Sequence, residues 1–263
     1  MLRNLARLTR YRGLIQSLVA RELKARYRGS VLGFFWSFIN PLLLLLIYSI
    51  VFQYFLPRGD DDLPPYEVFL FCGLLPWTWF STSLLESSGV LIAGGNLIKK
   101  VLFPAEVLPI VTVLANMVHF FLGLPILFAF ILYQGMPLYL NELAWFPVAV
   151  VVQLIVTLGC ALILSSLTVH FRDLRDILAN IMTFWFFATP IIYLYTDMPA
   201  NVMWWLNLNP FTHLAITYQE ILYFPGPVGH WYWLLVLGVL ALAFFMFGYF
   251  VFDRLRDTFA EEV

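Results

Sequence analysis

The segment 19–54 places basic residues directly before an apolar run that is long enough to cross a membrane. From Val31 to Leu56 the chain has no Asp, Glu, Lys or Arg, and at about 1.5 Å of rise per residue this run exceeds the roughly 30 Å hydrocarbon core. Because basic residues favour the cytoplasmic side of a membrane, the junction predicts a cytoplasmic N-terminal region. The basic residues at the junction are Arg21, Lys24, Arg26 and Arg28.

The rest of the chain has a similar character, with 62% hydrophobic and only 12% charged residues among 263. Soluble domains carry about 25% charged residues, so this composition predicts a polytopic membrane protein. We expect an all-α membrane protein, because the bilayer core favours segments that satisfy their own backbone hydrogen bonds. The six expected transmembrane spans lie in one membrane domain at 31–263, after an N-terminal segment 1–30, and cover about 31–56, 66–93, 105–133, 143–169, 177–195 and 231–252.

The loops between the expected spans differ in charge. Of the 15 Lys and Arg residues, only Arg58 falls on an expected outer loop, which predicts that both termini are cytoplasmic. The same loop carries Asp60, Asp61 and Asp62, which we interpret as solvated residues rather than a metal site because no further ligands cluster nearby.

The N-terminal segment 1–30 has the pattern of an amphipathic helix. Leucines recur at three-to-four-residue spacing, while Arg3, Arg7 and Arg10 lie on the opposite side. A mitochondrial targeting helix has a similar pattern, but here the helix continues directly into the first span. The pattern therefore favours an interfacial helix on the inner leaflet.

The inner loop at 96–103 has apolar residues at positions i, i+1, i+4 and i+5, namely Leu97, Ile98, Val101 and Leu102. On a short helix bounded by glycine and proline these residues share one face. Such a helix either rests on lipid or docks into a partner, and periodicity does not decide between the two.

The segment 197–225 is too long for a tight turn and too rich in Trp, Leu and Phe for an ordinary loop. We expect two short re-entrant helices that dip into the outer leaflet around Asn209-Pro210. Backbone of this kind is tolerated in a membrane only where protein or a cavity covers its polar ends.

Several kinds of chemistry have no support in the sequence. The phosphate-binding pattern G-x-x-x-x-G-K-[ST] is absent, so ATP hydrolysis by that route would need another subunit. The spans contain few ionisable residues, which argues against a transporter driven by protons or sodium. His119 is the ionisable residue nearest the midplane, and we expect it to be packed and hydrogen-bonded rather than a proton relay.

Five ordered stretches resemble the membrane subunit of type-two ABC exporters, and within that family the Wzm-like permeases for O-antigen polysaccharide, with teichoic-acid and capsule permeases close behind. The stretches are RELKARYRGSVLGFFWSFINPL at 21–42, FCGLLPWTWFS at 71–81, LIKKVLFPAEVLP at 97–109, VHFRDLRDI at 169–177 and TPIIY at 189–193.

The resemblance implies a multi-pass homodimer in the bacterial inner membrane that works with two copies of a separate ATPase. ATP and Mg²⁺ would then bind the partner and no cofactor would bind this chain; no nucleic acid is implied. Segment 1–30 would be a gate helix and 197–225 the outer gate helices. The coupling helix that docks into the ATPase would comprise Asn96, Leu97, Ile98, Lys99, Lys100, Val101, Leu102 and Phe103.

The cargo implied by the resemblance is a glycan on undecaprenyl diphosphate. The four basic residues at 21–28 stand where the diphosphate would arrive, although attraction to anionic lipid explains them equally well. Aromatic side chains commonly anchor spans at interfaces, yet they also stack on sugars and could line a passage. The candidate channel and gate aromatics are Phe35, Trp36, Tyr48, Trp77, Trp79, Phe184, Tyr193, Trp204 and Phe211.

Two alternatives stay open at this point. One is a type-two ABC exporter with another cargo, such as teichoic acid, capsule, a lipid or a drug. The other is a membrane enzyme that acts on lipid-linked sugars without a separate motor.

Overall fold

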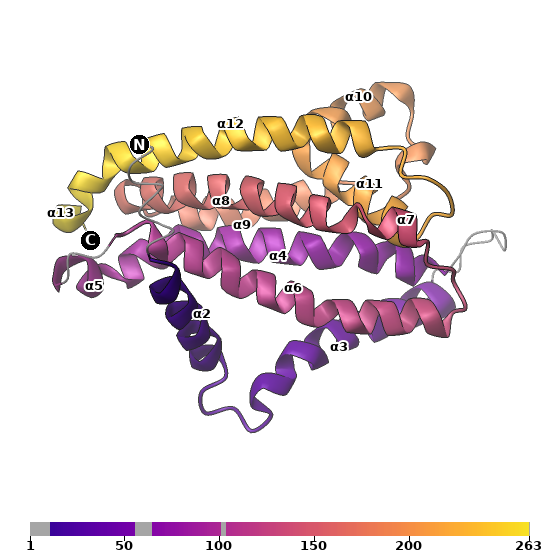
Figure 1. The fold of residues 1–263 in the computed structure, drawn as a ribbon, viewed down its shortest axis with the longest axis horizontal. Coiled ribbons are helices and arrows are strands. Elements are labelled where there is room, and N and C mark those ends of the chain that lie inside the picture. Colours follow the sequence, from indigo (N-terminus) through magenta and orange to yellow (C-terminus); the bar gives the residue numbers. More distant parts are fainter. Residues whose placement is uncertain (1–10, 56–64, 101–103, 263) are drawn as a thin grey trace.

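A computed structural model describes residues 11–55, 65–100 and 104–262, and these residues form helices and connecting turns without a strand (Figure 1). The α-helices are α2 (Arg12–Arg26), α3 (Trp36–Ile50), α4 (Tyr66–Ala93), α5 (Gly95–Lys100), α6 (Val107–Tyr133), α7 (Leu140–Leu143), α8 (Phe146–His170), α9 (Leu174–Phe187), α10 (Ala200–Leu208), α11 (Pro210–Leu222), α12 (Trp231–Leu255) and α13 (Phe259–Glu262).

Within the described residues, five helical segments are long and apolar enough to cross a membrane. They are Gly33–Ile50, Tyr66–Ala93, Val107–Tyr133, Leu140–His170 and Trp231–Thr258. The prediction of an all-α, multi-pass membrane protein is therefore confirmed, and these segments correspond to five of the six expected spans.

The remaining expected span, 177–195, is not one continuous helix. Helix α9 has 14 residues, which at about 1.5 Å per residue is short of the hydrocarbon thickness. It ends at Phe187 because Pro190 disfavours helical backbone at the residue before it, and Tyr193 donates a hydrogen bond of 3.2 Å to the freed Phe187 carbonyl. Between α9 and α10 the chain forms turns, bends and one short 3-10 helix at Tyr195–Asp197.

Helix α4 lies at the centre of the bundle and contacts α6, α8, α9 and α11 (Figure 1). Its burial is consistent with apolar residues on every side of the helix rather than on one stripe. Two side chains fix its neighbours: Gln153 of α8 donates a 2.8 Å hydrogen bond to the Pro76 carbonyl, and Trp79 donates one of 3.2 Å to the Val113 carbonyl of α6.

Helices α8 and α12 pack side by side along much of their length (Figure 1). Glycines allow this contact, because a Cβ atom added at Gly248 would lie 2.6 Å from the carbonyl oxygen of Gly159. Close approach of backbones through small residues is a common way to join helices in membranes.

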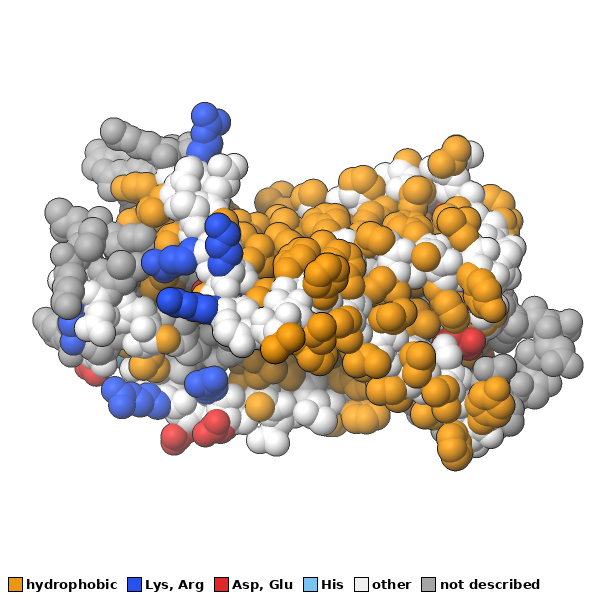
Figure 2. All heavy atoms as spheres, turned by 90° about the horizontal axis from the view of Figure 1, so that it is seen from below, with side chains coloured by type: hydrophobic (Ala, Val, Ile, Leu, Met, Phe, Trp, Pro, Cys, Tyr) orange, Lys and Arg blue, Asp and Glu red, His pale blue; other side chains and the backbone are white. Residues whose placement is uncertain are grey.

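Charge marks the two ends of the bundle. Lys99, Arg172, Arg175 and Arg254 belong to the end that carries α5, α13 and the α8–α9 turn (Figure 1). Figure 2 shows Lys and Arg side chains gathered at this same end, while hydrophobic side chains cover the rest of that face. The positive-inside rule predicts that this end faces the cytoplasm, with α10 and α11 toward the outside, and we name the two ends the cytoplasmic end and the outer end on that basis.

Candidate functional site

Helix α2 crosses the cytoplasmic end of the bundle instead of running parallel to its long helices (Figure 1). Leu18 is buried against Val107 and Val111 of α6, and Leu14, Ile15 and Val19 pack around this cluster. Apolar residues of segment 1–30 therefore pack on α6 within 12–26, while residues 1–10 lie outside the described part of the chain.

Three of the four basic residues predicted at the lipid entry are exposed. Arg21, Lys24 and Arg28 make no hydrogen bond or ion pair with other described residues, and blue side chains over α2 are visible in Figure 2. Arg21 and Lys24 are three residues apart and share one face of α2, and Arg28 follows in the turn after the helix. We call Arg21, Lys24 and Arg28 the basic collar.

Arg26 differs from the basic collar, because it points to the bundle. Its guanidinium donates a 2.5 Å hydrogen bond to Glu86 of α4 and a 3.0 Å hydrogen bond to the amide oxygen of Asn116 on α6. Asn116 in turn donates a 2.7 Å hydrogen bond to the same Glu86 oxygen. The three side chains form a closed network that joins α2, α4 and α6.

Tyr27 makes a second connection at the end of α2. Its hydroxyl lies 2.6 Å from the Ser37 hydroxyl of α3 and 3.3 Å from Nδ1 of His119 on α6. The Tyr27 and His119 rings also meet edge to face, with centroids 5.9 Å apart. His119 is thus a packed, hydrogen-bonded residue, as its apolar neighbourhood predicts.

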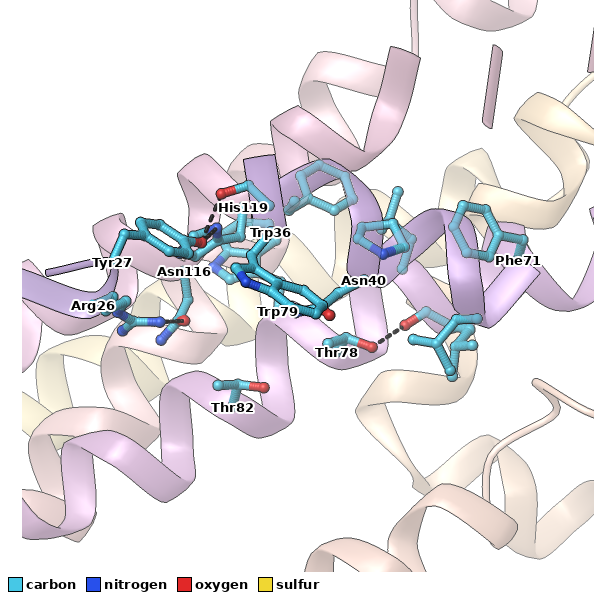
Figure 3. Close-up of a pocket in the computed structure, with 16 residues that line it drawn as sticks. Arg26, Tyr27, Trp36, Asn40, Phe71, Thr78, Trp79, Thr82, Asn116 and His119 are labelled. Atoms are coloured by element: carbon cyan, nitrogen blue, oxygen red, sulfur yellow. Dashed lines mark hydrogen bonds between the residues drawn. The ribbon is translucent and has the colours of Figure 1, made fainter. Parts of the chain in front are cut away.

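A cavity of about 300 Å³ lies between α2, α3, α4 and α6 (Figure 3). Arg26, Tyr27 and Asn116 lie at one end of this cavity, and Phe71 lies at the other. Trp36 and Trp79 belong to its middle section. The cavity therefore has a charged end near the cytoplasm and an aromatic interior. Its further apolar lining includes Leu44, Leu74, Leu75 and Phe120.

The aromatic residues predicted to face a channel do not form one group in this chain. Trp77 and Phe211 are buried in the bundle, with ring centroids 5.0 Å apart, and Trp79 stacks near Phe120 at 5.2 Å. Neighbouring side chains cover the rings of Trp77 and Phe211 within one chain, and the role predicted for them at a passage stays a prediction. Of the other candidates, Phe35, Phe184 and Trp204 are exposed, and the Trp36 side chain is about one-third exposed. Tyr48 and Tyr193 are half-buried.

The predicted coupling helix falls partly outside the described residues. Helix α5 covers Gly95–Lys100, and Asn96 and Lys99 are exposed on it. Val101, Leu102 and Phe103 lie outside the described residues, and the side chains of Leu97, Ile98 and Lys100 are not described. Helix α5 contacts α13 and the end of α4 at the cytoplasmic end (Figure 1).

At the outer end, α10 and α11 occupy the segment that follows the irregular stretch after α9. Asn209 joins them: its side-chain oxygen accepts from Phe211 N at 3.0 Å and from the Trp185 indole at 2.8 Å. Its amide nitrogen donates to the Ala188 carbonyl at 3.0 Å and to the Thr189 hydroxyl at 2.9 Å. One side chain therefore satisfies the backbone ends where α9 stops and α11 begins.

Glu86 and Asn116, which complete the Arg26 network, are not among the site residues predicted from the sequence. A signal was available in the spacing, since Asn116 and His119 are three residues apart in an otherwise apolar helix and share a face. Polar residues that share a face inside a membrane span indicate a cavity or a partner.

Comparison with known proteins places these features among transporter subunits. Residues 13–223 match the ABC-2 type transporter family. The chain is 38% identical to the O-antigen export system permease protein RfbA of Myxococcus xanthus over the whole of both chains. It is 32% identical to an RfbA permease of Klebsiella pneumoniae over 94% of each chain. It is 25% identical to the polysialic acid transport protein KpsM of Escherichia coli, over 78% of this chain and 80% of KpsM.

Proposed function

Because this chain belongs to the ABC-2 type transporter family, we propose that it is the membrane permease of an ABC exporter for an O-antigen-like polysaccharide. The observation that carries this proposal is the 38% identity to an O-antigen export permease over the full length of both chains. The cargo would be the glycan linked to undecaprenyl diphosphate, moved from the cytoplasm across the bacterial inner membrane.

A separate ABC ATPase would supply the energy, with ATP and Mg²⁺ bound to that partner. We assign the contact with this ATPase to helix α5 and the residues that follow it, up to residue 103. This assignment is supported by the position of α5 at the cytoplasmic end and by the exposure of Asn96 and Lys99. Two copies of the permease with two copies of the ATPase would form the working complex.

The chain would cross the membrane six times. Helix α8 ends at the cytoplasmic end, beside Arg172 and Arg175, whereas α10 lies at the outer end (Figure 1). The chain has to return to the outer side between these points, and α9 with the irregular segment after it is the part that does so. The residues from Ala188 to Leu194 continue the chain as turns and bends, and α9 together with these residues would complete the crossing.

The passage would lie between two copies of the chain. Helix α3 supports this arrangement, because only 11% of its span is buried within one chain. Helix α9 likewise exposes large apolar side chains, among them Phe184, which is 76% exposed. Faces of this kind contact lipid or a second copy, and the exposed candidates Phe35, Phe184 and Trp204 would be free to face a glycan.

The basic collar would meet the anionic diphosphate at the inner leaflet. Its three side chains are exposed and lack partners among the described residues, so each can reach a phosphate oxygen without breaking an existing contact.

The test is to co-express the chain with the ATPase encoded beside it and to purify the complex. We expect a complex that hydrolyses ATP and moves lipid-linked glycan into proteoliposomes. Leu97→Asp with Val101→Asp should lose the ATPase while keeping the permease folded.

The other readings predict different results. Turnover of a polyprenyl-linked sugar by the purified chain alone, without ATP, would identify a membrane enzyme and refute the exporter. An ATPase complex that exports a glycan-free lipid would retain the family but change the cargo.

A further inference from the structure

The cavity between α2, α3, α4 and α6 has the chemical profile of a site for an amphiphile. Its volume of about 300 Å³ is at the lower end of the range for ligand sites. That volume accommodates part of one hydrocarbon chain and is too small for a polysaccharide to pass. The cavity is therefore separate from the glycan passage proposed between two copies of the chain.

The interior of the cavity suits a hydrocarbon chain. Phe71, Leu74, Leu75 and Phe120 supply apolar walls. Thr78 also lines the cavity, but its hydroxyl donates to the Leu74 carbonyl at 2.8 Å, so it needs no polar partner from a ligand.

The cytoplasmic end of the cavity suits an anion. Arg26 and Asn116 both direct N–H groups at one oxygen of Glu86, at 2.5 Å and 2.7 Å. These donors form an anion site that the chain's own carboxylate occupies. The Glu86 side chain is 38% exposed, so it can move into water, and a phosphate oxygen can take its place without leaving either donor unpaired.

We propose that this cavity binds one chain of a phosphate-bearing lipid from the inner leaflet, whose headgroup displaces Glu86 from Arg26 and Asn116. The inference rests on the proposed function for the position of α2 at the inner leaflet. The required chemistry, a phosphate at the end of a long hydrocarbon, occurs in membrane phospholipids and in polyprenyl diphosphates alike.

Displacement of Glu86 would have a structural consequence. Arg26 is the residue of α2 that bonds to α4, and the rest of α2 packs on α6. Bound lipid would therefore release α2 from α4 and leave it on α6. A lipid at this site would set the position of the helix that carries the basic collar.

The test measures lipid binding to the delipidated full-length chain by native mass spectrometry. The probes are phosphatidylglycerol, undecaprenyl diphosphate and, as a lipid without phosphate, diacylglycerol. We expect at least one of the two phosphate lipids to bind, and whichever binds identifies the source of the lipid at this site. Diacylglycerol should bind at least tenfold more weakly.

Two substitutions should act in opposite directions. Arg26→Gln removes the cation and should weaken binding about tenfold, which corresponds to 1.4 kcal/mol. Glu86→Gln removes the competing charge and should strengthen binding about tenfold. If Glu86→Gln weakens binding as Arg26→Gln does, the network is only a structural connection and the proposal is refuted.

A second pair of variants tests the cavity without touching this network. Thr78→Phe fills the cavity and should abolish binding. Thr183→Phe is the matched control, because Thr183 is an exposed threonine of α9 with the same bond to a carbonyl four residues earlier. Binding that survives Thr78→Phe, or equal binding of diacylglycerol, would also overturn the proposal.

Failure of this proposal and failure of the exporter assignment give different results. A chain that binds the lipid but no ATPase would refute the proposed function and keep this site. A complex that exports glycan while Thr78→Phe leaves lipid binding unchanged would support the proposed function and refute this site.

Discussion

Substitution of Gly248 by alanine should weaken the bundle at its longest helix contact. A Cβ atom at this position would lie 2.6 Å from the Gly159 carbonyl oxygen and 3.3 Å from two further backbone atoms of Gly159. A flexible side chain could rotate away from such a clash, but helix backbone cannot. Helices α8 and α12 would have to separate by several tenths of an ångström.

Gly238 provides a matched comparison on the same helix. A Cβ atom there would meet only the Val152 side chain, at 3.2 Å. Alanine raises helix propensity by about 1 kcal/mol over glycine at either site, so this gain cancels when the two variants are compared. Overpacking a fixed interface costs about 1–3 kcal/mol, and we therefore expect Gly248→Ala to be about 2 kcal/mol less stable than Gly238→Ala.

The assay is unfolding of the purified chain in mixed micelles, followed by far-ultraviolet circular dichroism. A difference of about 2 kcal/mol should appear as a midpoint that is roughly 4–8 °C lower for Gly248→Ala in a thermal scan. If the two variants unfold within about 0.5 kcal/mol of one another, α8 and α12 do not approach through these glycines and the packing described above is incorrect.

Three further predictions concern polar residues. Asn209→Ala removes four hydrogen bonds and, at about 0.6 kcal/mol each, should lower the free energy of unfolding by roughly 2 kcal/mol. This variant should be cleaved faster by proteases between α9 and α11, whereas the exposed control Asn180→Ala should not, and equal proteolysis of the two would contradict the role of Asn209. Gln153→Leu removes the side-chain amide that donates to the Pro76 carbonyl of α4, and it should lower the free energy of unfolding by about 1–3 kcal/mol in the same unfolding assay. No change would mean that the hydrogen bond is dispensable. Arg21→Gln with Lys24→Gln should raise the KM for lipid-linked substrate severalfold in a transport assay. The increase should be smaller at high salt because both side chains are exposed, and an unchanged KM would exclude the basic collar from substrate capture.

Composition and charge predict the class of fold because they act on whole segments. An apolar run of sufficient length has few alternatives to a membrane helix, and the distribution of Lys and Arg orients it. The motifs along the chain identified the family, and the match over residues 13–223 confirms it. Length alone failed at α9, where Pro190 ends the helix early within a segment of suitable hydrophobicity.

The facing of individual side chains was less predictable. Trp77 is in a helix that is apolar on all sides, so periodicity cannot tell the core from a channel. The four basic residues of 21–28 are adjacent in sequence, yet Arg26 lies on a different face of α2 from Arg21 and Lys24. At about 100° per residue, Arg26 is some 140° away from Arg21, and only the packing of Leu18 on α6 shows which face is inward.

The position of Glu86 connects the two cytoplasmic features of the chain. Glu86 lies two turns before the end of α4, and α5 begins directly after Gly94. Gly94 lies close to α6, because a Cβ atom at this position would come within 2.6 Å of the Leu108 side chain, which would have to shift. The joint between α4 and α5 is thus held against α6, the helix on which α2 also rests. A displacement of α5 by a partner would therefore move the end of α4 that holds Glu86, and with it the carboxylate that binds Arg26. By this route a motor at α5 and a lipid at Arg26 would act on the same contact between α2 and α4.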